Sequence, residues 1–317
     1  MSACLYGAAR QRSTRKISWF LDTRGVWLVF LEITVVGFAW SFNFHTMPFL
    51  QVIWAIGWSM LALSALVRLP RAAILTIGVV MIAGHNAVDT LQPAFSDASL
   101  LWIVLHMPGI LKLGGTEAAV VVYPLIPWIG VMAVGYVLGF FFVSRDPKRP
   151  GRLILIGGAL TLCFLLLRGA NLYGDPNLWA PGQNTTTTLI RFLNATQYPA
   201  SLQFLLMTLG PAMMLLGWLE RATGRVAGIL VTIGRVSLFY YILHLYIIHT
   251  IDVLIGMGQG FSLGDMTVAF LENPSDFGVS LGCVYVVWAV TIVAMYPACA
   301  WFAGVKAMRR DWWLRYF

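Results

Sequence analysis

The sequence consists largely of apolar blocks of about 17 to 27 residues, and each is long enough to cross a hydrocarbon core roughly 30 Å thick as a helix. Inside lipid every backbone N–H and C=O group needs an internal partner, so blocks of this length are expected to be helical. Only 11% of the residues are charged, and the mean hydropathy is +0.78. Soluble proteins carry about a quarter charged residues. We therefore predict an all-α, polytopic integral membrane helix bundle.

The blocks predict about eight transmembrane helices, counted as separate apolar runs. They lie near residues 25–43, 48–67, 72–88, 120–143, 152–168, 200–219, 227–253 and 278–304. The stretch 98–111 is apolar but shorter, and Pro108 interrupts it, so it is expected to be a re-entrant or interfacial helix. This organisation divides the chain into a basic N-terminal segment at 1–24, a single transmembrane domain at 25–304 and a basic C-terminal tail at 305–317.

Lysine and arginine are distributed unevenly between the two sides of this topology. With the N-terminus in the cytoplasm, most of the 21 Lys and Arg residues fall on the cytoplasmic side, as the positive-inside rule requires. We therefore expect a multi-pass protein of the cytoplasmic (inner) cell membrane with both termini inside. The net charge of +8 then reflects topology, so the bilayer is the expected partner and nucleic acid is not. The residues on the cytoplasmic side are Arg10, Arg12, Arg15, Lys16, Arg24, Arg68, Arg71, Arg145, Lys148, Arg149, Arg152, Arg221, Arg225, Lys306, Arg309, Arg310 and Arg315.

All five histidines map to the outer half of this topology. Ionisable groups at membrane depth are costly and tend to mark a functional site. His85 and Asp89 are four residues apart, which places them on one helical face, with Asn86 beside them. Since a carboxylate can hold an imidazole in the tautomer of a general base, we predict His85 and Asp89 as catalytic residues and Asn86 as a substrate ligand. A polar cluster at a helix end is the structural alternative.

The seventh predicted span carries a second polar stripe, in which Tyr241 and His244 are three residues apart. We predict a catalytic or acceptor-side role for His244 and a substrate contact for Tyr241. Glu32 and Arg235 lie at similar depth from the cytoplasmic side. They are expected either to form a buried ion pair or to leave Arg235 facing a cavity, where it binds a phosphate or carboxylate of a donor.

Two external segments are dense in hydrogen-bonding groups and turn-forming residues, as a rigid binding loop would be. They predict substrate contacts, and the four cysteines show no spacing typical of a metal site or a disulfide, so no metal is expected. The predicted substrate contacts are Arg168, Asn171, Tyr173, Asp175, Asn194 and Tyr198.

Long ordered runs of the sequence resemble bacterial membrane proteins related to heparan-α-glucosaminide N-acetyltransferase. The resemblance extends from about Ser2 to Ile251 and includes FLDTRGVWLVFLEITVV (20–36), IAGHNAVD (82–89), LRGANLYGDP (167–176) and GRVSLFYYILHLYIIH (234–249). It implies a multi-helix membrane acyltransferase. Such an enzyme takes an acyl group from acetyl-CoA or another acyl-CoA on the cytoplasmic side and delivers it to a sugar or glycan on the outer side.

The resemblance also implies that relatives begin with about two further helices, which contain a Leu-Arg-Gly stretch, an Asp-His pair and the catalytic histidine of the family. Met1 aligns near the end of their second helix, so the sequence is expected to lack these two helices. No catalytic histidine is transferred from the relatives, and His85 is the substitute candidate. Whether the chain is an active enzyme stays open at this point.

These observations favour a membrane-bound acyltransferase, whether complete or truncated. Two alternatives stay open from the sequence. A transporter or flippase for an amphiphilic substrate would use the same polar interior as a pathway, and a non-catalytic membrane partner subunit would need no catalytic histidine. The identity of the acceptor, the length of the acyl chain and the oligomeric state, a homodimer included, are also open.

Overall fold

The computed structural model describes residues 1–8, 12–91, 99–144, 146–268, 272, 274–309 and 311–316. Three basic residues used to predict the topology, Arg10, Arg145 and Arg310, lie outside this described part, as does Ala98 at the start of the predicted short helix. The chain forms two compact units, each built from two segments. Unit 1 contains Met1–Val29 and Phe49–Arg221, and unit 2 contains Phe30–Pro48 and Ala222–Phe317.

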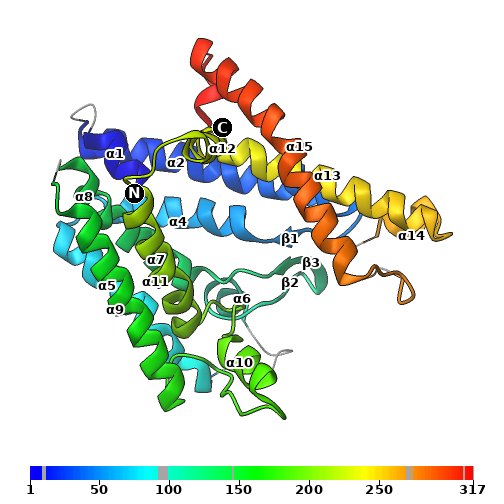
Figure 1. Ribbon diagram of the computed structural model, residues 1–317, viewed down its shortest axis with the longest axis horizontal. Helices are drawn as coiled ribbons and strands as arrows, with labels where there is room; N and C mark the ends of the chain where they lie inside the picture. The colour runs from blue at the N-terminus through cyan, green and yellow to red at the C-terminus, as the bar shows by residue number, and fades with distance from the viewer. Residues whose placement is uncertain are drawn as a thin grey trace. The chain divides into compact units, whose positions relative to one another are not determined.

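Unit 1 holds most of the helices and one small sheet, and its segments are drawn from blue to green in Figure 1. The predicted basic segment at 1–24 is itself helical over most of its length. The elements of unit 1 are α1 (Ser2–Ala8), the first part of α2 (Thr14–Leu31), β1 (Phe49–Leu50), α4 (Val52–Leu66), α5 (Arg71–Gly84), the 3₁₀-helix η2 (His85–Leu91), α6 (Leu100–Leu105), β2 (Gly109–Leu113), β3 (Thr116–Val121), α7 (Leu125–Leu138), α8 (Phe140–Val143), α9 (Arg149–Ala170), α10 (Thr185–Leu193) and α11 (Leu202–Leu219).

Unit 2 begins where α2 runs on without a break into a π-helix. The π-helical turn η1 (Glu32–Val36) continues directly into α3 (Gly37–Ser41). The later elements of unit 2 are α12 (Arg225–Arg235), α13 (Ser237–Gly258), α14 (Leu263–Met266), α15 (Leu281–Met308) and the 3₁₀-helix η4 (Trp313–Tyr316). The core of unit 2 lies where α12 and α13 pack against the second half of α15, around Val236, Met295 and Phe302.

Within the described residues, seven helical stretches are long and apolar enough to cross a membrane. The predicted second span, at 48–67, contains the shorter apolar helix α4, whose 15 residues extend about 22 Å. The prediction of a polytopic all-α bundle is therefore confirmed, and the chain is a multi-pass membrane protein. The seven stretches are Thr14–Ser41, Arg71–Leu91, Leu125–Val143, Arg149–Ala170, Leu202–Leu219, Ser237–Gly258 and Leu281–Met308.

The predicted span at 227–253 is not one continuous helix. The chain breaks at Val236, which separates α12 from α13 and whose side chain is fully buried in the core of unit 2. The break leaves the backbone carbonyl of Arg235 outside the helical ladder, and Lys306 Nζ donates a hydrogen bond to it at 3.0 Å. The helix is therefore interrupted although the apolar run is continuous, because Val236 is buried and Lys306 bonds the carbonyl that the break leaves exposed.

The stretch predicted as one short helix at 98–111 is helical only in its first half. After α6 the chain passes Pro108, which cannot donate a backbone hydrogen bond, and enters β2. A turn at Gly114 and Gly115, both with positive φ, joins β2 to β3, and β1 pairs parallel to β3 to give the order β1-β3-β2. The predicted span at 120–143 therefore starts as strand, and its helix α7 begins only after Pro124.

Three helix pairs of unit 1 approach each other closely at facing glycines. A Cβ atom on Gly157 of α9 would lie only 2.6 Å from the carbonyl oxygen of Gly210 on α11. Glycines also face one another between α2 and α4, at Gly25 and Gly57, and between α5 and α7, at Gly78 and Gly130. Small residues of this kind let membrane helices pack backbone to backbone. An ion pair between Arg149 and Glu220 also joins α9 to the end of α11.

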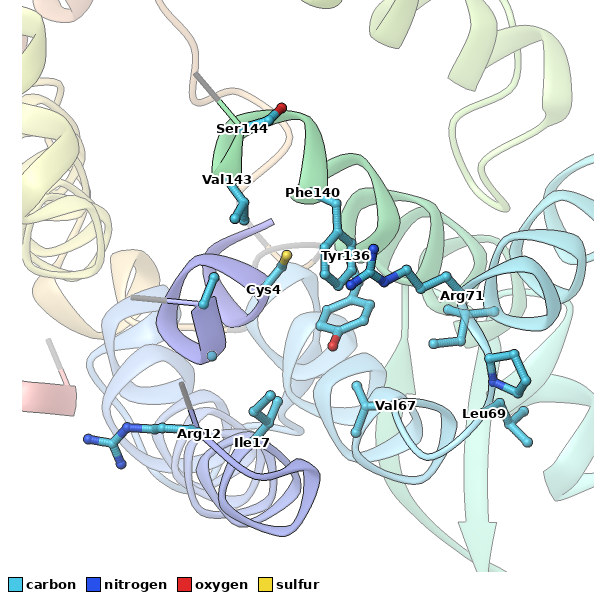
Figure 2. Close-up of a pocket in the computed structure, with 14 residues that line it drawn as sticks. Cys4, Arg12, Ile17, Val67, Leu69, Arg71, Tyr136, Phe140, Val143 and Ser144 are labelled. Atoms are coloured by element: carbon cyan, nitrogen blue, oxygen red, sulfur yellow. The ribbon is translucent and has the colours of Figure 1, made fainter. Parts of the chain in front are cut away.

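A cavity of about 660 Å³ lies in unit 1 where α5 begins (Figure 2). Its walls come from α1, the start of α2, the turn between α4 and α5, and the end of α7 with α8. At the other end of α5 the helix tightens into η2, which carries His85 and Asp89. Helix α5 therefore separates the cavity from the polar residues at 85–89.

Candidate active site

The 3₁₀-helix η2 arranges its polar residues differently from the α-helical spacing assumed from the sequence. A 3₁₀-helix has about three residues per turn, so residues three apart share a face. Asn86 and Asp89 have this separation, and Asn86 Nδ2 donates a hydrogen bond to Asp89 Oδ2 at 2.8 Å. The predicted His85, Asn86 and Asp89 group is therefore present at one helix end, but Asn86 rather than His85 is hydrogen-bonded to the carboxylate.

The imidazole that pairs with Asp89 belongs to His106, which follows α6. His106 Nε2 lies 3.0 Å from Asp89 Oδ1, and the His106 side chain is 1% exposed. In the neutral ring, donation from Nε2–H to the carboxylate leaves a lone pair on Nδ1. That Nδ1 atom is buried and has no hydrogen-bond partner among the described residues. This is the arrangement that a general base requires.

Two further rings surround His106. The Trp102 ring centroid lies 4.6 Å from that of His106, and the His85 centroid lies 6.1 Å from it. The indole Nε1 of Trp102 and both ring nitrogens of His85 are buried without a hydrogen-bond partner in the described part of the chain. The Ala200 backbone lies near His85 without forming a hydrogen bond of good geometry. We call His85, Trp102 and His106 the ring cluster.

Buried polar atoms without partners are rare because each costs free energy comparable to a lost hydrogen bond. The ring cluster gathers four of them in one region: Trp102 Nε1, His106 Nδ1 and the two nitrogens of His85. Trp102 Nε1–H can only donate a hydrogen bond, and His106 Nδ1 in the neutral ring can accept one. Such a set can satisfy a ligand that brings both a proton to be removed and an oxygen to be held.

The remaining side of the cluster is formed by the loop before α11. Asn86 Oδ1 accepts a hydrogen bond from the backbone N–H of Leu202 at 2.9 Å, which fixes η2 against the first turn of α11. The Tyr173 hydroxyl donates to the carbonyl of Ala83 at the end of α5. Burial, with a smaller contribution from the charge of Asp89, raises the pKa of Tyr173 above its ordinary value. Asn86 and Tyr173, both predicted as substrate ligands, thus hold elements together.

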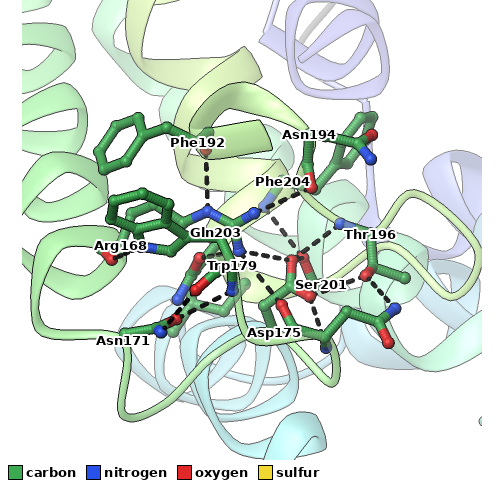
Figure 3. Close-up of polar contacts among 12 residues, drawn as sticks. Arg168, Asn171, Asp175, Trp179, Phe192, Asn194, Thr196, Ser201, Gln203 and Phe204 are labelled. Atoms are coloured by element: carbon green, nitrogen blue, oxygen red, sulfur yellow. Dashed lines mark hydrogen bonds and ion pairs between the residues drawn. The ribbon is translucent and has the colours of Figure 1, made fainter. Parts of the chain in front are cut away.

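Most of the other predicted substrate ligands form a separate network around Arg168 (Figure 3). Arg168 is 1% exposed, and its guanidinium donates to three backbone carbonyls at or near the end of α10, those of Arg191, Phe192 and Asn194, at 2.8 to 3.1 Å. It also donates to Gln203 Oε1 at 3.0 Å. Its donors are therefore spent within the protein.

Asp175 completes this network from the other side of the guanidinium. Its Oδ2 lies 3.6 Å from Arg168 Nη1, and its oxygens accept hydrogen bonds from the Thr196 hydroxyl at 2.7 Å and from Ser201 Oγ at 3.1 Å. Asn171 is paired with Trp179, donating to its carbonyl at 3.0 Å and accepting from its N–H at 3.2 Å. The network therefore folds the whole segment between α9 and α11 into a rigid block.

Tyr198 lies at the edge of the same block. Its hydroxyl is 3.3 Å from that of Tyr123, and the two rings meet edge to face with centroids 5.1 Å apart. The ring of Tyr198 is 43% exposed, so it remains open to contact with another molecule. Among the loop residues predicted to bind substrate, Tyr173 and Asn194 are also exposed, but Tyr173 is hydrogen-bonded to the end of α5.

The remaining predicted residues belong to unit 2. His244 Nδ1 lies 3.2 Å from the carbonyl of Tyr240, and the ring centroid of Tyr241 is 5.4 Å from that of His244. Glu32 is fully buried in η1, whereas Arg235 is exposed at the end of α12. The Glu32–Arg235 pair and the roles of His244 and Tyr241 stay predictions. In the part of the chain that the structure describes, no three His, Cys, Asp or Glu side chains are arranged to hold a metal ion.

Comparison with protein families identifies the region that holds this site. Residues 7–172, just over half of the chain, match the family described as heparan-alpha-glucosaminide N-acetyltransferase, catalytic. The chain belongs to the heparan-alpha-glucosaminide N-acetyltransferase family. The match includes the ring cluster, Asp89 and Arg168, and it confirms the resemblance read from the sequence. Comparison with curated proteins and with solved structures gave no match.

Sequence reasoning missed two residues of the cluster, Trp102 and His106. Both lie in the short apolar stretch that was interpreted only in terms of its position relative to the membrane. His106 and Asp89 are 17 residues apart, so no helical spacing links them. The available signal was the occurrence of a histidine in an apolar segment, because a buried imidazole needs a polar partner.

Proposed function

We propose that this chain is a membrane-bound acyltransferase that moves an acyl group from acyl-CoA to an amine or hydroxyl of a sugar or glycan. Its membership of the family supports a membrane acyltransferase. The observation that carries the proposal is the His106–Asp89 pair, with its buried and unpartnered Nδ1 on the far side of the imidazole. A carboxylate that orients a histidine, whose other ring nitrogen can take a proton, is a recurring arrangement in group-transfer enzymes.

In the proposed reaction, the acceptor nitrogen or oxygen attacks the thioester carbonyl carbon while His106 Nδ1 takes the proton from the acceptor. The resulting imidazolium is stabilised by Asp89, to which Nε2–H remains hydrogen-bonded. The C–S bond then breaks, and the leaving thiolate of coenzyme A takes the proton back from Nδ1. The ring ends in its starting state, and the acyl group ends on the acceptor.

The other two rings have supporting roles in this proposal. Trp102 Nε1–H is a donor without a partner in the described residues, so it can hold an oxygen of the acceptor or of the thioester. His85, which was the catalytic candidate from the sequence, stands 6.1 Å from His106 between ring centroids and has no carboxylate hydrogen bond in the described part of the chain. We therefore assign it to substrate contact rather than to proton removal.

The sidedness of the reaction follows the distribution of charge. We propose that the donor reaches the protein from the cytoplasm and that the acceptor binds on the outer side, with both termini inside and the protein in the cytoplasmic membrane. The clustering of Lys and Arg in the short turns, including Arg68, Arg71 and Arg149, supports this orientation.

The test uses the full chain in lipid nanodiscs with radiolabelled acetyl-CoA and a glucosamine-terminated oligosaccharide as acceptor. We expect acetylated product and free coenzyme A in equal amounts. His106→Gln and Asp89→Asn should each lower kcat by about 100-fold or more, as expected for loss of general-base catalysis. His45→Gln is the matched control, because His45 is an exposed histidine that, among the described residues, is hydrogen-bonded only to Asn43 in its own turn.

His85→Gln separates the two candidate bases. We expect it to raise KM more than it lowers kcat, because His85 contacts substrate without taking the proton. A His106→Gln protein that keeps its full turnover while His85→Gln loses it would show that the base is His85. Absence of any acyl transfer by the unmodified chain would refute the proposed activity itself.

A further inference from the structure

The cavity at the start of α5 lies at the opposite end of that helix from His85 and Asp89. Its volume of about 660 Å³ is within the range of small-molecule sites. The lining residues come from segments far apart in the sequence, and three polar side chains, Cys4, Arg71 and Tyr136, lie together at its centre (Figure 2). The rest of the wall is mainly apolar and is formed by Ile17, Val67, Leu69, Ile74, Phe140 and Val143.

Arg71 is the cation of this cavity. Its guanidinium lies over the Phe140 ring, with the central carbon 3.6 Å from the ring centroid. Stacking of this kind fixes the plane of the guanidinium and leaves its N–H edge free for a bidentate contact. Among the described residues Arg71 has neither a carboxylate partner nor a hydrogen bond. A fixed and uncompensated positive charge facing a partly apolar cavity favours an anionic ligand.

The beginning of α5 adds to the positive potential at the same place. Pro70 is its N-cap residue and supplies no side-chain acceptor, so the first backbone N–H groups of the helix are uncapped. The N-terminal end of a helix carries a partial positive charge. Arg12 also lines the rim, although its guanidinium lies over the Tyr6 ring at 4.3 Å, and Figure 2 shows it directed away from the centre. The anion is therefore expected beside Arg71.

We infer that this cavity binds a phosphate ester attached to an apolar or flexible chain. The phosphate would contact the N–H edge of Arg71 and the start of α5, and the attached chain would lie along the apolar wall. Two molecules carry this chemistry at a membrane surface: an anionic phospholipid and coenzyme A. Binding of coenzyme A here would rest on the proposed function, in which acyl-CoA is the donor, whereas binding of a phospholipid would not. Neither the ring cluster nor Asp89 lines the cavity, so a failure of binding here can be told apart from a failure of the proposed catalytic residues.

Two binding measurements on the full chain distinguish the two sources of phosphate. In the first, the chain in detergent is titrated with phosphatidylglycerol, with phosphatidylcholine as the neutral reference. In the second, it is titrated with soluble coenzyme A, with pantetheine as the phosphate-free reference. We expect one of the two phosphate esters to bind, and Arg71→Gln to weaken that binding by about tenfold or more, as loss of a charge-assisted contact would.

Arg68→Gln is the matched control, since Arg68 is an exposed arginine of the same turn that does not line the cavity. It should bind the ligand as the unmodified chain does. Equal affinity of the Arg71→Gln and Arg68→Gln proteins would overturn the inference, as would failure of both phosphate esters to bind.

A second readout avoids any variant that fails to fold. Cys4 lines the cavity and is 2% exposed, so a bound ligand should slow its alkylation by a maleimide in the unmodified chain. Burial raises the pKa of the Cys4 thiol, and the labelling is therefore followed at alkaline pH by mass spectrometry of the Cys4 peptide. Several-fold protection by one of the two phosphate esters supports the site, and an unchanged rate with both of them refutes it.

Discussion

At the scale of single residues, Asp89 and Arg168 were both predicted as site residues from polar segments at the ends of predicted helices. Their hydrogen bonds differ. Asp89 accepts one hydrogen bond from Asn86 and pairs with His106, and Nδ1 of that imidazole has no protein partner in the described residues. In Arg168, by contrast, all three guanidinium nitrogens donate hydrogen bonds to neighbouring protein groups. A buried nitrogen without a hydrogen-bond partner is available to a substrate. A guanidinium whose donors are all hydrogen-bonded within the protein stabilises the fold instead.

This difference predicts that Arg168 acts on stability rather than on substrate binding. Arg168→Lys keeps the charge but loses most of the planar donors, so the free energy of unfolding should fall by about 2–5 kcal/mol. Thermal unfolding in detergent measures the effect. Arg191→Lys is the control, because Arg191 is exposed and its guanidinium makes one hydrogen bond within the described part of the chain, to the carbonyl of Pro181. An unchanged melting temperature combined with a raised KM for the acceptor would restore the substrate role predicted from the sequence.

Residues that lie close together in the sequence could be grouped from the sequence alone. The cluster of His85, Asn86 and Asp89 follows from their spacing at one helix end, and the structure keeps them together there. The identity of the paired histidine could not be predicted in the same way. Asp89 bonds His106 across a chain separation of 17 residues, and that contact depends on how α6 packs. Likewise, the segment around Arg168 was recognised as rigid, but its spatial partners at Gln203 and the end of α10 were not.

At the scale of elements, the glycine contact between α9 and α11 predicts opposite effects for two neighbouring substitutions. A Cβ on Gly157 would meet backbone atoms of α11 at 2.6 and 2.7 Å, whereas Gly158 has nothing within 4 Å. Gly157→Ala should therefore destabilise the protein by about 1–3 kcal/mol through overpacking. Gly158→Ala should be neutral or stabilise it by up to about 1 kcal/mol through helix propensity. Melting temperatures of the two variants check the sign of each effect, and equal shifts would contradict the close packing of the helices.

Element prediction was accurate for the long helices because length and apolarity decide whether a chain can lie in lipid. It was wrong where a local signal competed with an apolar run. The Gly114–Gly115 pair is a hairpin signal that marks the β2–β3 turn, yet the hydrophobic residues before and after it suggested helices. The break at Val236 could not be predicted from a proline, because the sequence has none there. It depends on burial of that side chain against α15, which only the folded unit provides.

At the scale of the whole molecule, the distribution of positive charge predicts the orientation of the chain in the membrane. Green fluorescent protein fused after Phe317 should fluoresce, because it folds in the cytoplasm, while alkaline phosphatase at the same point should be inactive. An epitope inserted between Gly114 and Gly115, in the exposed β2–β3 turn, should be accessible only from outside. The opposite result at either position would show that the predicted orientation is wrong, and the proposed sides of donor and acceptor would be wrong with it.

The discontinuous make-up of the two units has a consequence for biosynthesis. Unit 2 contains Phe30–Pro48, which is made early, and Ala222–Phe317, which is made last. At roughly 5–20 residues per second, a ribosome needs about 10–35 s to make the intervening segment. Throughout that interval the turn η1, which contacts α13 in the finished protein, is already synthesised without that helix. Glu32 in this turn is fully buried in the finished protein. We therefore expect η1 to be incompletely packed in the newly inserted chain until α13 has been made.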